Sequence, residues 1–268
     1  MRYLIALAFT LAVASAATLK SDRIIGGTVT TINQYPEMVQ LLQGSGNNFF
    51  QDCAGTIINN RAILSAAHCT IQFGASMRRI RYGSSFRTSG GTVITVNRVI
   101  NHPNYDPRNE DNDFSILWVN GNIPETATSR PALLAGANYY PADNQVVWAA
   151  GWGHTIAGDH SSMSNQLRHV QVWVVNQGIC RQRYANRVVN DIFGRPRPAP
   201  ITITDNMLCS GWLDRGGRDQ CQGDSGGPLY HNGVVVGVCS FGHGCALPYF
   251  PGVNARVSRV VGWINQNR

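Results

Sequence analysis

The segment of this chain with the clearest chemical meaning is Gly223-Asp224-Ser225-Gly226-Gly227-Pro228. A serine hydroxyl is a weak nucleophile until a neighbouring base removes its proton. Glycines on both sides permit the sharp backbone turn that exposes the hydroxyl and directs backbone N–H groups at one point. An ordinary glycine turn is the alternative, but six specified residues in a row favour a nucleophilic serine at position 225.

A candidate base lies far upstream, in Ser65-Ala66-Ala67-His68-Cys69, directly after the apolar segment Ala62 to Leu64. A single histidine is more often structural than catalytic. The cysteine beside His68 can anchor its loop, however, and this favours a positioned imidazole that exchanges a proton.

A third motif, Asp111-Asn112-Asp113-Phe114-Ser115-Ile116-Leu117, is an acidic turn that enters an apolar strand. A carboxylate buried there needs a hydrogen-bond partner. The Nδ1–H of a histidine would satisfy Asp113 and would fix the tautomer of the ring. A turn-capping aspartate is an equally good interpretation of this motif alone.

The elements that must hold these motifs are predicted to be antiparallel strands, because alternating or β-branched runs are separated by Gly, Asn and Pro clusters. The runs are Glu37 to Leu42, Thr92 to Ile100, Gln145 to Ala150, Leu167 to Val175 and Val234 to Phe241. Only the end of the chain differs. Its apolar residues are spaced as on one helix face, which predicts an amphipathic helix from Arg256 to Gln266. The proline-rich stretch Arg195 to Pro200 is predicted to be an exposed loop, because proline lacks a backbone donor.

The N-terminus has the features of a secretory signal. Arg2 gives a positive start, Leu4 to Ala14 are apolar but too few to span a bilayer, and Ala14-Ser15-Ala16 fits a cleavage site. A buried N-terminal helix is the alternative. We therefore expect residues 1–16 to be removed, and the remainder to be secreted into the extracellular space with no membrane association.

The basic balance of the chain does not indicate a nucleic-acid partner. The formal net charge is +7, but the arginines are spread along the chain and no recognition motif accompanies them. From Ile24 onward the chain contains 19 arginines, 14 acidic residues and no lysine. Arginine keeps its charge where lysine loses it, near pH 10, so this surface would suit an alkaline fluid such as a gut lumen. Compositional drift is the alternative.

Together, the three motifs and their order resemble the chymotrypsin–trypsin family of serine proteases. The resemblance runs from Ile24 to Arg268 and is strengthened by Ile24-Ile25-Gly26-Gly27, Gly151-Trp152-Gly153 and Pro251-Gly252-Val253. The lysine-free composition is most similar to digestive trypsins of moths and butterflies. The resemblance implies an all-β fold for residues 24–268: two packed six-stranded antiparallel barrels, with the active site between them and a short C-terminal helix.

The same resemblance implies the catalytic roles. Ser225 would attack the substrate carbonyl, His68 would act as base and then acid, and Asp113 would orient His68. Backbone N–H groups of Gly223 and Ser225 would form the oxyanion hole. No cofactor is implied.

It also implies a precursor. Residues 17–23 would be a propeptide, and cleavage of the Arg23–Ile24 bond by another trypsin-like protease would free an amino group to pair with Asp224. A loop-capping role is the alternative for Asp224.

The specificity pocket implied by the resemblance has Asp219 at its base, with Ser240, Gly242 and Gly252 in its walls. A desolvated carboxylate needs a cationic partner, which predicts cleavage after arginine or lysine. Serine usually follows this aspartate, but Gln220 stands here, and we expect a stronger preference for arginine because a small hydroxyl helps to solvate a bound lysine. Asn254 replaces a usual tyrosine near the pocket floor.

The seven cysteines of an exported chain predict disulfides with one cysteine left over. By resemblance the pairs are Cys53–Cys69, Cys180–Cys209 and Cys221–Cys245. Cys239 would then be a small buried hydrophobe, with a reactive thiol as the alternative. No metal site is expected, and the loop after Cys69 lacks the glutamates with which vertebrate trypsins bind calcium.

The expected partners are protein and peptide substrates, the activating protease and protein protease inhibitors, and we expect a monomer. A digestive role is the first hypothesis. A selective processing protease for cocoon softening, hatching or a defence cascade is the second, and an inactive homologue is the third. The long segment Asn186 to Pro200 either narrows the choice of protein substrates or is a tolerated insertion.

Overall fold

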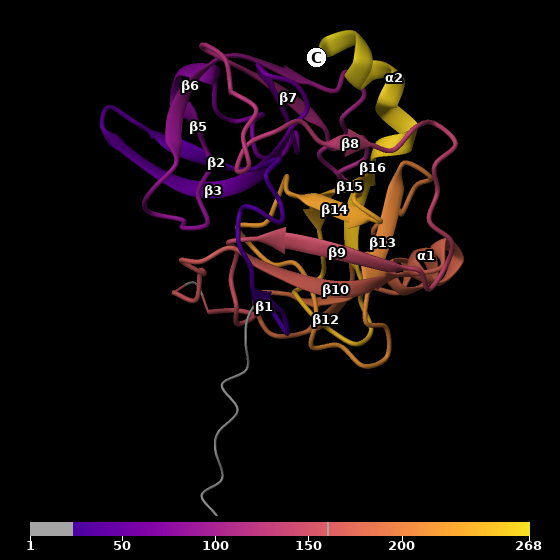
Figure 1. Ribbon diagram of the computed structural model, residues 1–268. Coiled ribbons are helices and arrows are strands. Elements are labelled where there is room, and N and C mark those ends of the chain that lie inside the picture. The colour runs from indigo at the N-terminus through magenta and orange to yellow at the C-terminus, as the bar shows by residue number, and fades with distance from the viewer. Residues whose placement is uncertain (1–23, 160) are drawn as a thin grey trace, which may run out of the picture.

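The computed structural model describes residues 24–159 and 161–268, which form the strands, two α-helices and one short 3₁₀ helix shown in Figure 1. The predicted signal peptide, the propeptide and Arg23 lie outside the described residues. The elements of the N-terminal half are β1 (Thr28–Val29), β2 (Met38–Ser45), β3 (Asn48–Ile57), β4 (Ala62–Ser65), η1 (Ala75–Met77), β5 (Arg78–Tyr82), β6 (Thr92–Asn101), β7 (Ser115–Val119) and β8 (Leu133–Leu134). The C-terminal half contains β9 (Val146–Gly151), β10 (Arg168–Val174), α1 (Gln177–Ala185), β11 (Val188–Asn190), β12 (Pro196–Pro198), β13 (Met207–Gly211), β14 (Pro228–His231), β15 (Val234–Phe241), β16 (Gly252–Arg256) and α2 (Val257–Asn267).

The first half closes into a barrel of antiparallel strands in the order β2-β3-β4-β7-β6-β5. Closure removes the open strand edges, and alternation of side chains directs one face of each strand into the barrel. In β5, for example, Arg78, Ile80 and Tyr82 are buried while the two residues between them are half-exposed.

The second half closes in the same way. Its strands follow the order β10-β13-β16-β15-β14-β9, and β9 pairs back to β10 through six residue pairs beginning with Arg168 and Gly151. Two short strands are added outside this ring: β1 pairs antiparallel with β10, and β8 pairs parallel with β15. The prediction of two six-stranded antiparallel barrels is confirmed.

The C-terminal helix α2 lies across both halves at the top of the molecule (Figure 1). Its buried residues are Val257, Ser258, Val260 and Ile264. The indole nitrogen of Trp118, on β7 of the first barrel, donates to the carbonyl oxygen of Asn267 at 3.0 Å. The helix therefore ties the end of the chain to the first barrel, and its predicted bounds differ by one residue at each end.

The proline-rich stretch was predicted to be an exposed loop. It is exposed, but Pro196–Pro198 form strand β12, which pairs with β11 in a hairpin. Backbone hydrogen bonds join Ala199 to Arg187 at 2.9 Å and Asp191 to Arg195 at 2.8 Å. Antiparallel ladders bond at every second residue, so both prolines occupy positions where no donor is needed. The prediction of a loop was wrong for this reason.

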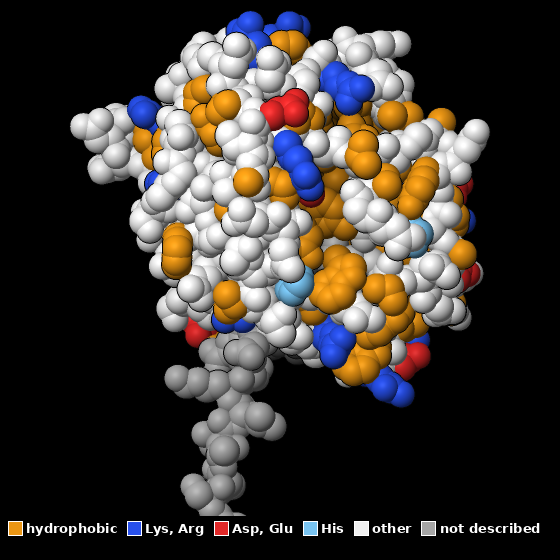
Figure 2. Space-filling view, viewed as in Figure 1, with side chains coloured by type: hydrophobic (Ala, Val, Ile, Leu, Met, Phe, Trp, Pro, Cys, Tyr) orange, Lys and Arg blue, Asp and Glu red, His pale blue; other side chains and the backbone are white. Residues whose placement is uncertain are grey.

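Hydrophobic side chains with arginines among them gather on the face formed by β9 and β10 (Figure 2). On this half of the molecule, the guanidinium of Arg218 lies 5.7 Å from the ring centre of Trp173 and 4.6 Å from that of Trp212. Such cation–π contacts let arginine cover aromatic surface while it stays charged. Within the described residues, no helix is long and apolar enough to cross a membrane.

Candidate active site

His68 lies at the end of the loop after β4, and its ring is held by Asp113. The Nδ1 atom of His68 is 2.7 Å from Oδ2 of Asp113, and the backbone N–H of His68 donates to Oδ1 at 2.9 Å. Asp113 is fully buried and also accepts a hydrogen bond from the Ser240 hydroxyl at 2.5 Å. A carboxylate held by three donors fixes the position of the ring and makes Nδ1 the protonated nitrogen.

The same carboxylate controls the basicity of His68. Burial alone would lower the pKa of His68, but the hydrogen bond and the charge of Asp113 outweigh it, with smaller contributions from Glu110 and Asp52. The net effect is a raised pKa. A stronger base is better able to accept a proton from a serine hydroxyl.

Ser225 lies just before β14, in the glycine-rich turn, which is hydrogen-bonded to strands of both barrels. Its carbonyl oxygen accepts from the backbone N–H of Ala54 on β3 at 2.7 Å, and Gly226 N–H donates to Cys239 on β15 at 2.8 Å. Gly223 has a φ of 95°, and a Cβ there would lie 2.8 Å from the end of Met163. The positive φ and the close backbone of Gly153, 3.0 Å from such a Cβ, both favour glycine at this position.

Ser240 connects the pair His68–Asp113 with the cavity that Ser225 lines. The Ser240 hydroxyl bonds Asp113, and Ser240 and Ser225 line the same cavity. Among the described residues, no hydrogen bond joins the Ser225 hydroxyl to the ring of His68. Contacts of this kind often tighten only when substrate is bound.

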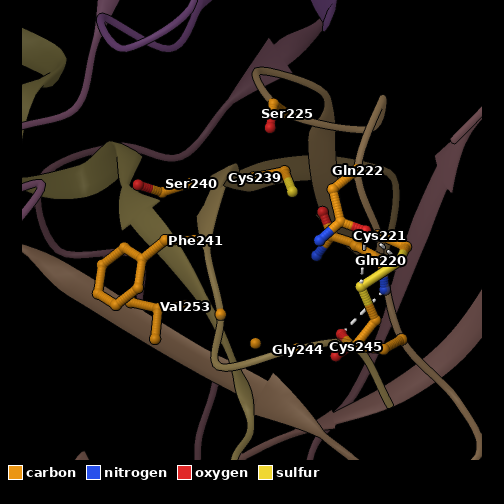
Figure 3. Close-up of a pocket in the computed structure, with 13 residues that line it drawn as sticks. Gln220, Cys221, Gln222, Ser225, Cys239, Ser240, Phe241, Gly244, Cys245 and Val253 are labelled. Carbon is orange, nitrogen blue, oxygen red and sulfur yellow. Dashed lines mark hydrogen bonds between the residues drawn. A yellow bond between two sulfur atoms is a disulfide. The ribbon is translucent and has the colours of Figure 1, made fainter. Parts of the chain in front are cut away.

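The cavity beside Ser225 has a volume of about 210 Å³ and contains every residue predicted for the specificity pocket. Figure 3 shows Ser225, Cys239 and Ser240 along one side, Phe241 and Val253 along a second, and Gln220 and Gln222 across from them. Gly252 keeps the base open, because a Cβ there would lie 2.8 Å from Oδ1 of Asp219.

Asp219 is the acid of this cavity. It is 5% exposed, and its two oxygens accept from the backbone N–H groups of Gln220 and Ala246, each at 2.9 Å. Burial raises the pKa of Asp219 to about 7, and the charge of Asp224 adds to this, although the two backbone hydrogen bonds oppose it. A carboxylate that is costly to ionise when the cavity is empty gains most from a cationic ligand.

Comparison with known proteins fits this geometry. The family model described as Trypsin matches residues 24–264. This chain belongs to the trypsin family. Over 266 residues it is 56% identical to "Trypsin, alkaline C" of Manduca sexta, covering 99% of this chain and 98% of the relative. It is 54% identical to "Trypsin CFT-1" of Choristoneura fumiferana, with both chains fully covered, and 49% identical to "Achelase-1" of Lonomia achelous over 91% of this chain and all of that protein.

As a member of the trypsin family, the protein is a serine endopeptidase. Its structure forms the three disulfides that the resemblance implies: Cys53–Cys69, Cys180–Cys209 and Cys221–Cys245. The first joins β3 to the loop of His68, and the third joins two segments of the pocket wall.

The seventh cysteine, Cys239, was expected to be a small buried hydrophobe, but the structure places it differently. Cys239 is partly exposed and lines the pocket between Ser225 and Ser240 (Figure 3). Cys239 follows the buried Val238 on β15, at the start of a register shift in the pairing with β16, and lines the pocket together with Ser240 and Phe241. Burial nevertheless raises the pKa of its thiol well above the usual value.

Glu110 is a residue near the catalytic centre that the sequence did not reveal. Ligand atoms of His68, Glu110 and Asp113 lie within 4.8 Å of one another, as a metal site would require. Asp113, however, already accepts from His68 and Ser240. The grouping of His68 with Cys53 and Cys69 contains a disulfide, so it offers no thiolate. Glu110 accepts a hydrogen bond from the Tyr105 hydroxyl at 2.5 Å, and its charge contributes to the raised pKa of His68.

Two further roles were also hidden in the sequence. Ser240 was expected only as a pocket residue, but it also bonds Asp113, from a strand 127 residues away. Gln222 lines the pocket without having been predicted. Neither residue lies in a motif, and only the closed second barrel brings them to the site.

Proposed function

We propose that this chain is made as a precursor and, once activated, cleaves peptide bonds after arginine and, less readily, after lysine. The observation that carries this proposal is the buried carboxylate of Asp219 in the cavity that also holds Ser225. A long cationic side chain in this cavity would neutralise Asp219 and bring the following carbonyl to Ser225. A neutral side chain would leave the carboxylate unpaired at a cost of several kcal/mol, on the order of a broken buried ion pair.

The proposed chemistry is acyl transfer. Oγ of Ser225 attacks the carbonyl carbon while Nε2 of His68 takes the hydroxyl proton, and the N–H groups of Gly223 and Ser225 stabilise the oxyanion. His68 gives the proton to the leaving amine, and water then hydrolyses the ester with His68 again as base. Asp113 stays ionised throughout and stabilises the imidazolium.

The surroundings of Asp224 support activation at the Arg23–Ile24 bond. Asp224 is 1% exposed, and its carboxylate accepts from the backbone N–H groups of Gly153 and Cys221. Burial raises its pKa to about 6, and no cation of the described residues lies within 4.0 Å of it. Ile24 is fully buried, and Ile25 bridges to Asp219. The amino group freed at Ile24 would supply the missing cation and would order the pocket.

For its biological role we propose digestion of dietary protein in an alkaline gut lumen after secretion. The names of the Manduca sexta relatives, "Trypsin, alkaline", and the absence of lysine after residue 23 support this setting. The partners would be protein and peptide substrates, an activating trypsin-like protease and protein protease inhibitors, and the enzyme would act as a monomer.

A selective processing protease is the second candidate, and the hairpin β11–β12 favours it. At the hairpin tip Ile192 is 93% exposed and Phe193 is 73% exposed. At the base of the hairpin, Nε of Arg187 donates to Nδ1 of His243 at 3.1 Å. His243 lies between two glycines that line the pocket. A projecting apolar tip on a hairpin whose base contacts the pocket wall could select among protein substrates.

Purified precursor cleaved at Arg23–Ile24 tests the proposal. We expect turnover of peptide amides with arginine before the cleaved bond, weaker turnover with lysine and almost none with phenylalanine. Ser225→Ala should abolish all turnover, which also distinguishes an enzyme from an inactive homologue. Asp219→Ser should selectively remove the reaction after basic residues. Equal turnover of arginine and phenylalanine substrates by the unmodified enzyme would contradict the proposal.

A further inference from the structure

Two buried amide side chains, Gln220 and Asn254, meet at the base of the pocket. Gln220 is 9% exposed and Asn254 is fully buried. The Nε2 atom of Gln220 donates to Oδ1 of Asn254 at 3.0 Å. Asn254 lies on β16, next to Val253 of the pocket wall, but does not itself line the cavity.

The orientation of the Asn254 amide is fixed by its other neighbours. Its Nδ2 atom donates to the backbone oxygen of Leu208 at 3.2 Å and to the Ser210 hydroxyl at 3.1 Å. A peptide oxygen can only accept, so the nitrogen of Asn254 must face Leu208. The oxygen of Asn254 is therefore the atom that faces Gln220.

This orientation determines what Gln220 presents to the pocket. Because Asn254 offers an acceptor, Gln220 must turn its nitrogen toward it, and its Oε1 atom takes the other direction. Within the described part of the chain, Oε1 has no hydrogen-bond donor and is not among the buried polar atoms without a partner. Gln220 lines the cavity, and Figure 3 shows its side chain at the cavity wall. Among the described residues, Oε1 is thus an accessible acceptor without a donor, on a side chain that lines the cavity.

The free acceptor suits a guanidinium group. Asp219 can receive two N–H groups of arginine side by side, but a guanidinium has five such donors in a plane. A neighbouring neutral acceptor would satisfy a further donor without adding a second buried charge. A lysine ammonium has fewer donors and is more strongly hydrated, so it gains less from this acceptor.

We propose that Asn254 is a positioning residue, which fixes the amide of Gln220 so that Oε1 becomes a second acceptor for the guanidinium of an arginine substrate. The inference rests on the proposed cleavage after arginine. The preference for arginine would then come from the Oε1 atom of Gln220, which is present in the pocket, and not from the absence of a serine hydroxyl at position 220.

The test measures kcat/KM for two peptide amides that differ only in arginine or lysine before the cleaved bond. Gln220→Leu and Asn254→Ala should each lower the value for arginine about tenfold, mainly through KM, while lysine changes less than about threefold. Competitive inhibition by benzamidine should weaken about tenfold, whereas inhibition by n-butylamine should stay within about threefold. Ser210→Ala is the matched control, because it leaves the Leu208 oxygen to hold Asn254.

The double variant Gln220→Leu with Asn254→Ala separates positioning from a general loss of structure. If Asn254 acts only through Gln220, the double variant has the arginine-to-lysine ratio of Gln220→Leu alone. An equal fall for both substrates in Asn254→Ala, or additive losses in the double variant, would overturn the inference. An Asn254→Ala protein that does not fold leaves Gln220→Leu to decide, since an unchanged ratio there overturns it as well. Failure of the proposed function would look different, because the unmodified enzyme would then turn over neither substrate.

Discussion

Asp219 and His68 are two ionisable residues that, in the proposed mechanism, must both lose a proton before the enzyme acts on an arginine substrate. Burial raises the pKa of Asp219 to about 7, and the hydrogen bond and charge of Asp113 raise that of His68. Below about pH 7 the Asp219 carboxyl becomes neutral and no longer attracts a cation. Below its own raised pKa, the His68 ring is protonated and no longer accepts the serine proton.

We therefore predict an acid limb of kcat/KM that is steeper than a single ionisation gives. For an arginine substrate, the slope of log kcat/KM against pH should approach about 2 below about pH 7. In Asp219→Asn, measured on an ester of a neutral residue, the slope should return to about 1. A slope of about 1 in the unmodified enzyme would show that only one of the two groups titrates in this range.

Cys239 gives a second prediction at this scale. Its raised pKa keeps the thiol protonated, but the thiol lines the pocket. Labelling of the native enzyme by methyl methanethiosulfonate should therefore be slow near pH 8, reduce turnover when it occurs, and be blocked by benzamidine. Cys239→Val supplies the control, since it should stay active and unlabelled. Labelling at the same rate with and without benzamidine would place the thiol outside the pocket.

Among the structural elements, the glycine-rich turn has the strictest backbone requirement. Gly223 has a φ of 95°, and a Cβ there would meet Met163 at 2.8 Å and the Cα of Gly153 at 3.0 Å. Gly223→Ala should displace the oxyanion N–H and lower kcat by roughly 100-fold or more, with little change in KM. Gly233, which has a φ of 78° but open space around it, gives a matched control in Gly233→Ala. If both variants lowered kcat by the same factor, the strain of alanine at a positive φ would explain the loss, and a special role of the Gly223 N–H would be contradicted.

The hairpin β11–β12 allows the two hypotheses for the segment from Asn186 to Pro200 to be separated. Ile192→Ser combined with Phe193→Ser removes the exposed apolar tip but leaves Arg187 and its contact with His243 in place. If the tip selects protein substrates, kcat/KM for large proteins should change several-fold while that for short peptides stays constant. Unchanged digestion of a protein mixture would identify the segment as a tolerated insertion.

The strands that carry the site were largely predictable, but the placement of single residues within them was not. The β-branched run at the start of Val234 to Phe241 predicted a strand, because such residues favour buried strands. It did not show that Cys239 faces the pocket or that Ser240 reaches Asp113, since both depend on pairing with distant strands. The helix α1 was missed because it buries only Cys180 and Tyr184 and shows no apolar stripe. Its N-cap is Asn176, whose side chain accepts from the N–H groups of Gly178 and Ile179.

For the whole molecule, the arginine-only surface is the feature with a measurable consequence. Arginine stays charged between about pH 9 and pH 11, where lysine loses its proton. We predict that the enzyme stays soluble across this range. A variant that carries lysine at a set of exposed arginines should become less soluble over the same range; the set is Arg61, Arg98, Arg130, Arg195, Arg215 and Arg268. Equal solubility of the two proteins would assign the missing lysines to compositional drift.

The central claim joins both barrels: Asp219 at the base of the pocket and Ser225 at its rim make an enzyme that cuts after positive side chains. The most direct measurement is mass spectrometry of the peptides that the activated enzyme releases from a mixture of unfolded proteins, with Ser225→Ala as the blank. The account predicts new C-termini that are almost all arginine, with lysine second, and no products from Ser225→Ala. New C-termini dominated by apolar or acidic residues, or products that persist with Ser225→Ala, would contradict it.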